Sequence, residues 1–116
     1  MSRHLPPLLA CAAALAFLTS AQSVSALTIV LTNDDGFDAP GIQALKAALS
    51  DEHTVILVAP LDQQSGSSAA LNFESPAVLV TKVAESGDDL EFAVSTFESG
   101  GTEGAEPASC ALVGLS

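Results

Sequence analysis

Basic residues are scarce in this sequence. Its 116 residues include only three lysines and arginines against fourteen aspartates and glutamates, which gives a formal net charge of −11. A protein that holds nucleic acid through its phosphates needs a basic stripe, and Arg3, Lys46 and Lys82 cannot supply one. We therefore expect no nucleic-acid polymer as a partner. If a phosphate binds, a cation or the amides of a helix N-terminus must offset its charge.

A long apolar run is also lacking. Leu8–Leu18 is apolar but short of the ~20 residues that a membrane-spanning helix needs. It follows a short polar start and precedes the small-residue pattern Val24-Ser25-Ala26, which is typical of a secretory cleavage site. Residues 1–26 are thus predicted to be a signal peptide. We expect an exported protein, periplasmic or secreted, without stable membrane association.

Cysteine occurs only twice. Cys11 falls within the predicted leader, so residues 27–116 contain Cys110 alone and cannot form an internal disulfide. Their stability must come from burial, which is modest in a domain of this size. The chain stops within the apolar run Val113–Ser116, which indicates a fragment of a longer protein.

Two apolar runs with a helical pattern between them predict an α/β fold. Leu27–Leu31 and Thr54–Ala59 are typical of strands buried on both faces of a parallel sheet. Between them, Asp38 is a plausible N-cap with Pro40 in the first turn, and the helix should end between Ser50 and His53. This βαβ unit predicts a Rossmann-like parallel sheet.

The second half of the chain gives a weaker pattern. Val78–Val83 is predicted to form a third strand, and the alternating apolar residues of 90–94 a fourth, with a turn at 86–89. Residues 99–107 are rich in glycine and glutamate and predict a flexible loop. Cys110 opens a short apolar stretch that suits a buried helix or strand.

Two acidic residues stand where ligands bind in parallel α/β sheets. Asp34 and Asp35 follow the first strand and Ser65 lies in the loop after the second, so all three belong to the carboxyl ends of the strands. Adjacent carboxylates repel unless a cation joins them, and hard divalent ions prefer such oxygen ligands. The chemistry indicated is metal-assisted hydrolysis of a phosphate monoester. A solvated turn formed by Asn33–Gly36 is the alternative.

The same residues belong to a longer motif. Thr32–Gly36 with Asp38–Ile42, followed by Val58–Pro60 and Gln64–Ser68, resembles the opening of SurE-type nucleotidases. The resemblance is close from Leu27 to Phe73 and loose beyond. It implies a Rossmann-like core and release of phosphate from nucleoside 5'- or 3'-monophosphates, or other phosphomonoesters, with Mg²⁺ or Mn²⁺. It also implies a homodimer or larger oligomer in the longer protein.

The resemblance assigns roles to individual residues. Asp34, Asp35 and Ser65 would bind the metal, and Asn33 and Asp34 would take part in catalysis. The residues expected to contact substrate are Asn33, Gly41, Ser65 and Gly66. A fourth metal ligand of the family, an asparagine in a Ser-Gly-x-Asn-x-Gly motif, is not reached by this chain.

The chain also departs from the family pattern. Leu61-Asp62 stands where many members carry Asp-Arg, so an arginine that could assist phosphate binding is missing.

Two other functions stay open. One is a truncated metal-binding remnant without turnover. The other is a receiver-type signalling domain, which needs a phosphoacceptor aspartate at the end of its third strand, where Val78–Val83 has none.

Overall fold

The structure, a computed structural model, describes residues 25–67, 70–71 and 77–116. The predicted signal peptide lies outside the described residues except for its last two positions, and so does Ser68 of the second motif. Within the described residues the elements follow the order β1, α1, β2, β3, β4, α2. Neither helix in this part of the chain is long and apolar enough to cross a membrane.

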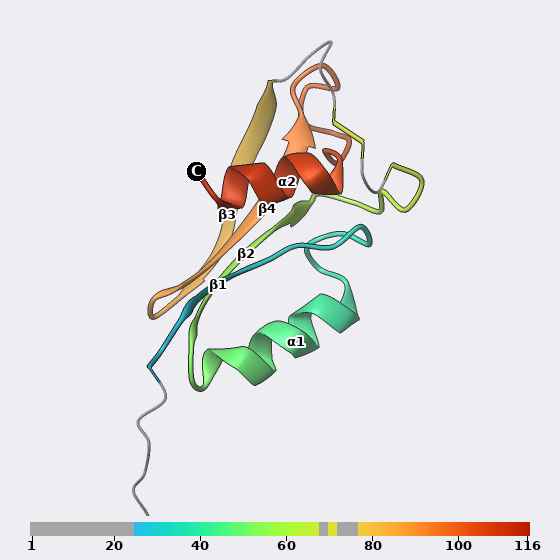
Figure 1. Cartoon of the computed structure of the whole chain (residues 1–116). Coiled ribbons are helices and arrows are strands. Elements are labelled where there is room, and N and C mark those ends of the chain that lie inside the picture. Colours follow the sequence, from blue (N-terminus) through green and yellow to red (C-terminus); the bar gives the residue numbers. More distant parts are fainter. Residues whose placement is uncertain (1–24, 68–69, 72–76) are drawn as a thin grey trace, which may run out of the picture.

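The strands form one mixed sheet in the order β1-β2-β4-β3 (Figure 1). β1 (Thr28–Leu31), β2 (Thr54–Pro60) and β4 (Asp89–Thr96) are parallel, and β3 (Val78–Ser86) pairs antiparallel with β4. The predicted α/β, Rossmann-like class is confirmed. β3 is longer than predicted and contains an irregularity between Lys82 and Ala84.

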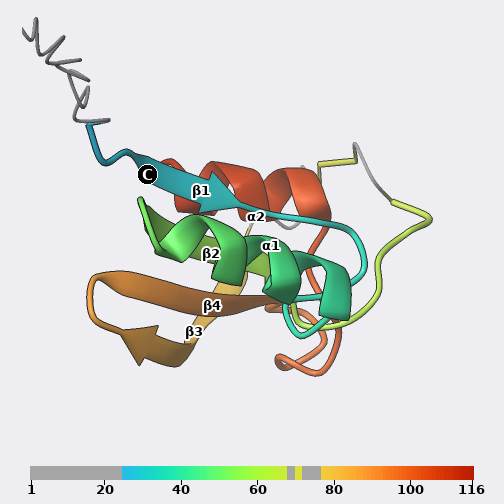
Figure 2. The same cartoon turned by 90° about the horizontal axis from the view of Figure 1, so that it is seen from below.

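The two helices cover opposite faces of this sheet (Figures 1 and 2). α1 (Pro40–Ser50) packs Ile42 against Leu57 and Ala59 of β2. α2 (Pro107–Gly114) packs Cys110 on the other face, in a core cluster with Val58, Val94 and Ala105. Alternate residues of β2 therefore serve two separate cores, as the two-residue period of a strand requires.

The expectation that both apolar runs are buried on both faces is correct for β2 alone. Val55 and the residues from Leu57 to Pro60 are buried, because β2 lies between two strands and two helices. Thr28 is exposed and the rest of β1 is half-buried. Among the described residues β1 pairs only with β2 and forms an edge of the sheet. Its side chains are therefore less buried than its apolar composition predicts.

The prediction that Asp38 caps α1 is wrong. The N-cap is Ala39, with φ −59° and ψ 134°, and no side-chain cap bond is made. Pro40 at the first helical position restricts the residue before it to extended backbone, which puts the cap one residue later than Asp38. The predicted end of the helix is confirmed, because α1 ends at Ser50.

Two connections also differ in detail. The predicted turn at 86–89 is shorter than expected, since Ser86 and Asp89 are already paired and Gly87, with φ +60°, makes the tight turn. The loop predicted at 99–107 ends where α2 begins, at Pro107. Its backbone is tied to β4, because the Thr96 amide donates to the Glu103 carbonyl at 2.9 Å.

Candidate metal and phosphate site

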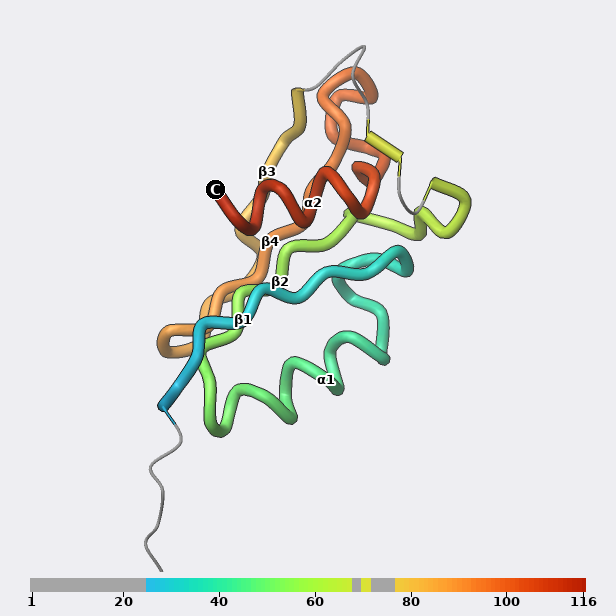
Figure 3. Tube along the Cα trace, in the orientation of Figure 1, coloured from blue at the N-terminus to red at the C-terminus, as the bar shows by residue number. Residues whose placement is uncertain are grey.

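The three parallel strands end on the same side of the sheet, and their loops gather there (Figures 1 and 3). The loop after β1 carries Asp34, and the loop after β2 carries Ser65. The Gln64 amide donates to the Asp34 carbonyl at 2.6 Å, and the Phe37 amide donates to the Pro60 carbonyl at 2.9 Å. These bonds place the two predicted ligand loops side by side.

Gly36 explains why the motif after β1 ends in glycine. Its φ is +107°, which a residue with a side chain rarely adopts, and it is buried. A Cβ atom there would lie 3.4 Å from the Asp62 carbonyl carbon. The Asn33 side-chain nitrogen donates to the Gly36 carbonyl at 2.9 Å. The run is therefore a tight turn, and this turn fixes the orientation of the Asn33 amide.

The other end of that amide has no partner. With its nitrogen bound to Gly36, the Asn33 Oδ1 atom is buried and accepts no hydrogen bond from the described residues. A buried acceptor left in this state costs about 1–3 kcal/mol. An amide oxygen is also a suitable ligand or hydrogen-bond acceptor beside a hard cation. The site thus has an unsatisfied oxygen that a hydrated cation or a protonated phosphate could satisfy.

Two carboxylates follow Asn33 in the sequence of this loop. Asp34 is half-buried and Asp35 is exposed, and within residues 25–67, 70–71 and 77–116 neither side chain forms a hydrogen bond or ion pair. The lysines are bound elsewhere, Lys46 to a glutamate at 2.8 Å and Lys82 to another at 2.6 Å. Negative charge at this edge is therefore not offset by a basic side chain of the described part.

The chemistry of this donor set fits a hard divalent ion only if neutral oxygens contribute. The described residues contain no cluster of three or more His, Cys, Asp or Glu side chains that could hold a metal. Asp34 and Asp35 would need the oxygens of Asn33, Ser65 or water to complete the coordination. Mg²⁺ and Mn²⁺ accept such mixed oxygen sets.

The remaining predicted residues lie at the rim of this edge. Ser65 and Gly66 are exposed in a turn, and the Ser65 hydroxyl accepts a hydrogen bond from the Gln63 side chain at 3.1 Å. Gly41 is the second residue of α1, and outside its chain neighbours and the helix backbone no heavy atom lies within 4 Å of where its Cβ would be. The structure brings the Ser65 loop to the Asp34 backbone; it records no side-chain contact between the two residues.

Sequence reasoning did not assign a role to Asp62. Its Oδ1 atom accepts hydrogen bonds from the Gly104 amide at 2.6 Å and from the Gln64 side chain at 3.0 Å. It thereby connects the loop after β4 to the loop after β2. The only signal in the sequence is that Asp62 stands where the family resemblance implies an arginine in many members.

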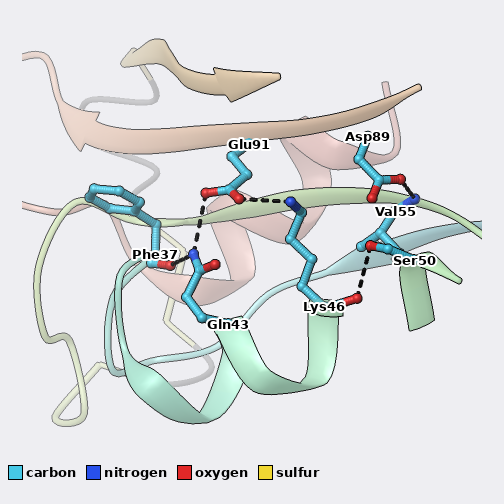
Figure 4. Close-up of polar contacts among 7 residues, drawn as sticks. All are labelled: Phe37, Gln43, Lys46, Ser50, Val55, Asp89 and Glu91. Atoms are coloured by element: carbon cyan, nitrogen blue, oxygen red, sulfur yellow. Dashed lines mark hydrogen bonds and ion pairs between the residues drawn. The ribbon is translucent and has the colours of Figure 1, made fainter. Parts of the chain in front are cut away.

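A polar bridge holds α1 to β4 beside the site (Figure 4). Lys46 Nζ lies 2.8 Å from one carboxylate oxygen of Glu91, and both side chains are 13% exposed. The Gln43 side chain donates to the other Glu91 oxygen at 3.2 Å and to the Phe37 carbonyl at 2.7 Å. This bridge, formed by Gln43, Lys46 and Glu91, fixes the end of the motif loop against the sheet.

Cys110 lies in the α2 core and is not part of the site. Burial of the thiol and the nearby Glu106 charge raise its pKa to about 12. A thiol with that pKa is almost wholly protonated near neutral pH and is a poor nucleophile. The prediction that Cys110 belongs to the core is confirmed.

Comparison with known proteins gives consistent matches. The model of the family described as Survival protein SurE matches residues 29–116. The chain is 43% identical to the 5'-nucleotidase SurE of Clostridium beijerinckii over 90 residues, which cover 78% of this chain and 32% of that protein. It is 53% identical to the 5'/3'-nucleotidase SurE of Serratia proteamaculans over 55 residues, covering 47% and 22% respectively. The chain thus spans about a third or less of the length of these relatives.

Proposed function

The chain belongs to the SurE family, and on this basis we propose that it is part of a divalent-metal-dependent phosphomonoesterase acting on nucleoside 5'- or 3'-monophosphates. The observation that carries the proposal is the junction of the loops after β1 and β2, where the Gln64 amide donates to the Asp34 carbonyl at 2.6 Å. The buried Asn33 oxygen beside that junction lacks a partner among the described residues.

In this proposal the metal is held mainly by Asp34 and Asp35, with Ser65 as a further oxygen ligand. A bound Mg²⁺ or Mn²⁺ would polarise a phosphoryl oxygen and lower the pKa of a bound water. The two carboxylates would offset the charge of the cation, and their mutual repulsion would be relieved when it binds.

Asn33 and the backbone around it would orient the substrate. Its amide is fixed by the bond from Nδ2 to the Gly36 carbonyl, so Oδ1 has a defined direction and could orient the attacking water or a phosphate hydroxyl. Gly41 lies in the first turn of α1, whose free amides carry partial positive charge and suit an anionic phosphate. Ser65 and Gly66 would contribute from the neighbouring turn.

The receiver-type alternative is not supported by the sheet. Its third strand would have to be parallel and end in a phosphoacceptor aspartate, whereas β3 is antiparallel to β4 and ends at Ser86. A metal-binding remnant without turnover is the remaining rival. The chain contains three of the ligands that the family resemblance implies, so we expect weak metal binding and no measurable turnover from these 116 residues alone.

Phosphate release separates these functions. The longer protein should be stripped of metal with a chelator and assayed on adenosine 5'- and 3'-monophosphate and on an aryl phosphate. We expect no release without metal and recovery with Mg²⁺ or Mn²⁺ at micromolar to millimolar concentration. Full activity in the chelator, or no activity with any divalent ion, would refute the proposal.

Export is a separate proposal with its own test. The small-residue pattern Val24-Ser25-Ala26 places cleavage after Ala26. N-terminal sequencing of protein recovered from the periplasm or medium should give Leu27 as the first residue. Recovery of intact Met1 from membrane fractions would reverse the assignment.

A further inference from the structure

Asp62 is an exposed residue on the loop after β2, and its carboxylate joins two loops. One oxygen, Oδ1, accepts the Gly104 amide at 2.6 Å and the Gln64 side-chain amide at 3.0 Å. Gly104 belongs to the loop after β4, 42 positions away in the sequence. We call this pair of bonds the Asp62 clasp.

The backbone of Asp62 is packed against glycines on both sides. A Cβ at Gly104 would lie 2.5 Å from Asp62 Oδ1, which is closer than real Cβ contacts come, and 3.0 Å from the Asp62 amide nitrogen, which is a tight contact. A Cβ at Gly36 would lie 3.4 Å from the Asp62 carbonyl carbon. The loops after β1, β2 and β4 therefore meet at one residue.

The clasp continues into the predicted metal loop through Gln64. The side chain of Gln64 is held by Asp62, and its backbone amide donates to the Asp34 carbonyl at 2.6 Å. A shift of Gln64 would therefore move either the Asp34 backbone or the neighbouring Ser65. Residues that hydrogen-bond directly to metal ligands typically change metal affinity 10- to 100-fold, and Asp62, which acts through Gln64, should lie at the low end of that range.

We propose that Asp62 is a positioning residue, which fixes the loop after β2 against Asp34 and against the loop after β4 so that the cation ligands are held in place. This inference rests on the proposed function. Asp62 itself acts through Gln64 and does not touch the cation or the substrate. Both of its donors are neutral amides, so an uncharged acceptor of the same shape can replace the carboxylate.

Metal titration of the complete protein tests the clasp against a simple charge effect. Mn²⁺ affinity should be measured by isothermal titration calorimetry for wild type, Asp62→Ala, Asp62→Asn and the control Glu98→Gln. Glu98 is an exposed acid of the loop after β4. We expect Asp62→Ala to weaken Mn²⁺ binding about 10-fold. Asp62→Asn retains Oδ1 and should stay within about two-fold, as should Glu98→Gln.

A second variant keeps the test valid if Asp62→Ala does not fold. Gln64→Ala removes the link to the metal loop and leaves the bond between Asp62 and the Gly104 amide. It should weaken Mn²⁺ binding several-fold, and the effects of Asp62→Ala and Gln64→Ala should not add in the double variant. Hydrogen exchange at the Gly104 amide should rise in Asp62→Ala and stay low in Gln64→Ala.

The outcomes are distinct. Unchanged Mn²⁺ affinity in folded Asp62→Ala, or an equal loss in Asp62→Ala and Glu98→Gln, would overturn the positioning role. Wild-type protein that binds Mn²⁺ with the expected dependence on Asp62 but releases no phosphate would overturn the proposed function alone. Wild-type protein that binds no Mn²⁺ would overturn both.

Discussion

Aspartates at the two ends of the parallel strands can differ in whether their side chains are bound within the protein. At the amino end, Asp89 is buried and accepts the Val55 amide at 2.7 Å. At the carboxyl end, the Asp34 and Asp35 side chains have no hydrogen-bond or ion-pair partner among the described residues. Asp89 thus holds the backbone, whereas Asp34 and Asp35 are available for a ligand, which residue type alone does not reveal.

The polar bridge lies between these two ends, and in it each charged side chain has a partner of opposite charge. Lys46 Nζ lies 2.8 Å from one Glu91 carboxylate oxygen, with both side chains 13% exposed, and the Gln43 side chain donates to the other oxygen (Figure 4). A cation at the carboxyl end would do for Asp34 and Asp35 what Lys46 does for Glu91. The contrast predicts activity effects at the carboxyl end and stability effects elsewhere.

The largest effect is expected from Asp34→Asn and Asp35→Asn in the longer protein. Each change removes a charge that would hold the cation, so we expect phosphate release to fall by about 100-fold or more. Stability should change little, or rise in the absence of metal, because two adjacent carboxylates repel. Steady-state phosphate release and thermal unfolding with a chelator present measure the two quantities.

Asp38→Asn is the matched control. Asp38 is an exposed acid of the same loop and does not cap α1. Its replacement should therefore change activity by less than about two-fold and the free energy of unfolding by only a few tenths of a kcal/mol. If Asp38→Asn removed activity while both other variants retained it, the assignment of Asp34 and Asp35 to the metal would be wrong.

The elements around this end were predictable because they depend on local patterns. The predicted strands Leu27–Leu31 and Thr54–Ala59 are confirmed as β1 and β2, and each observed strand differs from its predicted range by one residue at one end. Because the two strands are parallel, their carboxyl ends lie together. The position of Asp34 beside the Ser65 loop follows from that geometry. The roles of these residues stay predictions, because they depend on a ligand.

What could not be predicted depends on contacts between distant residues. The placement of β4 between β2 and β3 depends on parallel pairing with β2, about thirty residues earlier in the sequence, and the Asp62 clasp joins positions 42 residues apart. The apolar stretch at Cys110 suited a helix or a strand equally, since short apolar runs do not distinguish them. The error at Asp38 was local: Pro40 made Ala39 the cap.

The polar bridge gives the second prediction, in which stability changes and activity does not. Glu91→Ala leaves Lys46 largely buried without its partner, so we expect a loss of about 2 kcal/mol in the free energy of unfolding. Chemical denaturation measures it, and activity per folded molecule should stay within about two-fold, because Gln43 can still donate to the Phe37 carbonyl of the motif loop.

Pairing can be tested with an apolar replacement of both charges. Lys46→Met combined with Glu91→Leu should be less destabilising than Glu91→Ala alone, because no buried charge is then left without a partner. An equal loss in both proteins would show that packing of the Glu91 stem, and not the ion pair, accounts for the effect.

The smallest effect is expected from Asp89→Asn, and it should depend on pH. The Ser50 hydroxyl, the Val55 amide and the Lys46 charge lower the pKa of Asp89 below its ordinary value. A carboxyl with a lowered folded-state pKa stabilises the fold above the ordinary aspartate pKa of about 3.9. That contribution is lost as the pH falls through the folded-state pKa.

Asparagine can still accept the Val55 amide but carries no charge, so the difference between wild type and Asp89→Asn isolates this ionisation. The wild type should be the more stable protein at neutral pH, and the difference should shrink in acid.

Glu85→Gln is the control. Lys82 lowers the pKa of Glu85 too, but its ion pair is about half exposed, with side-chain exposures of 53% and 54%, and solvent screening should leave a weaker pH dependence. Urea midpoints between pH 3 and 7 measure both. If Asp89→Asn instead reduced phosphate release at neutral pH without changing stability, the amino end would share in function and the contrast between the two ends would fail.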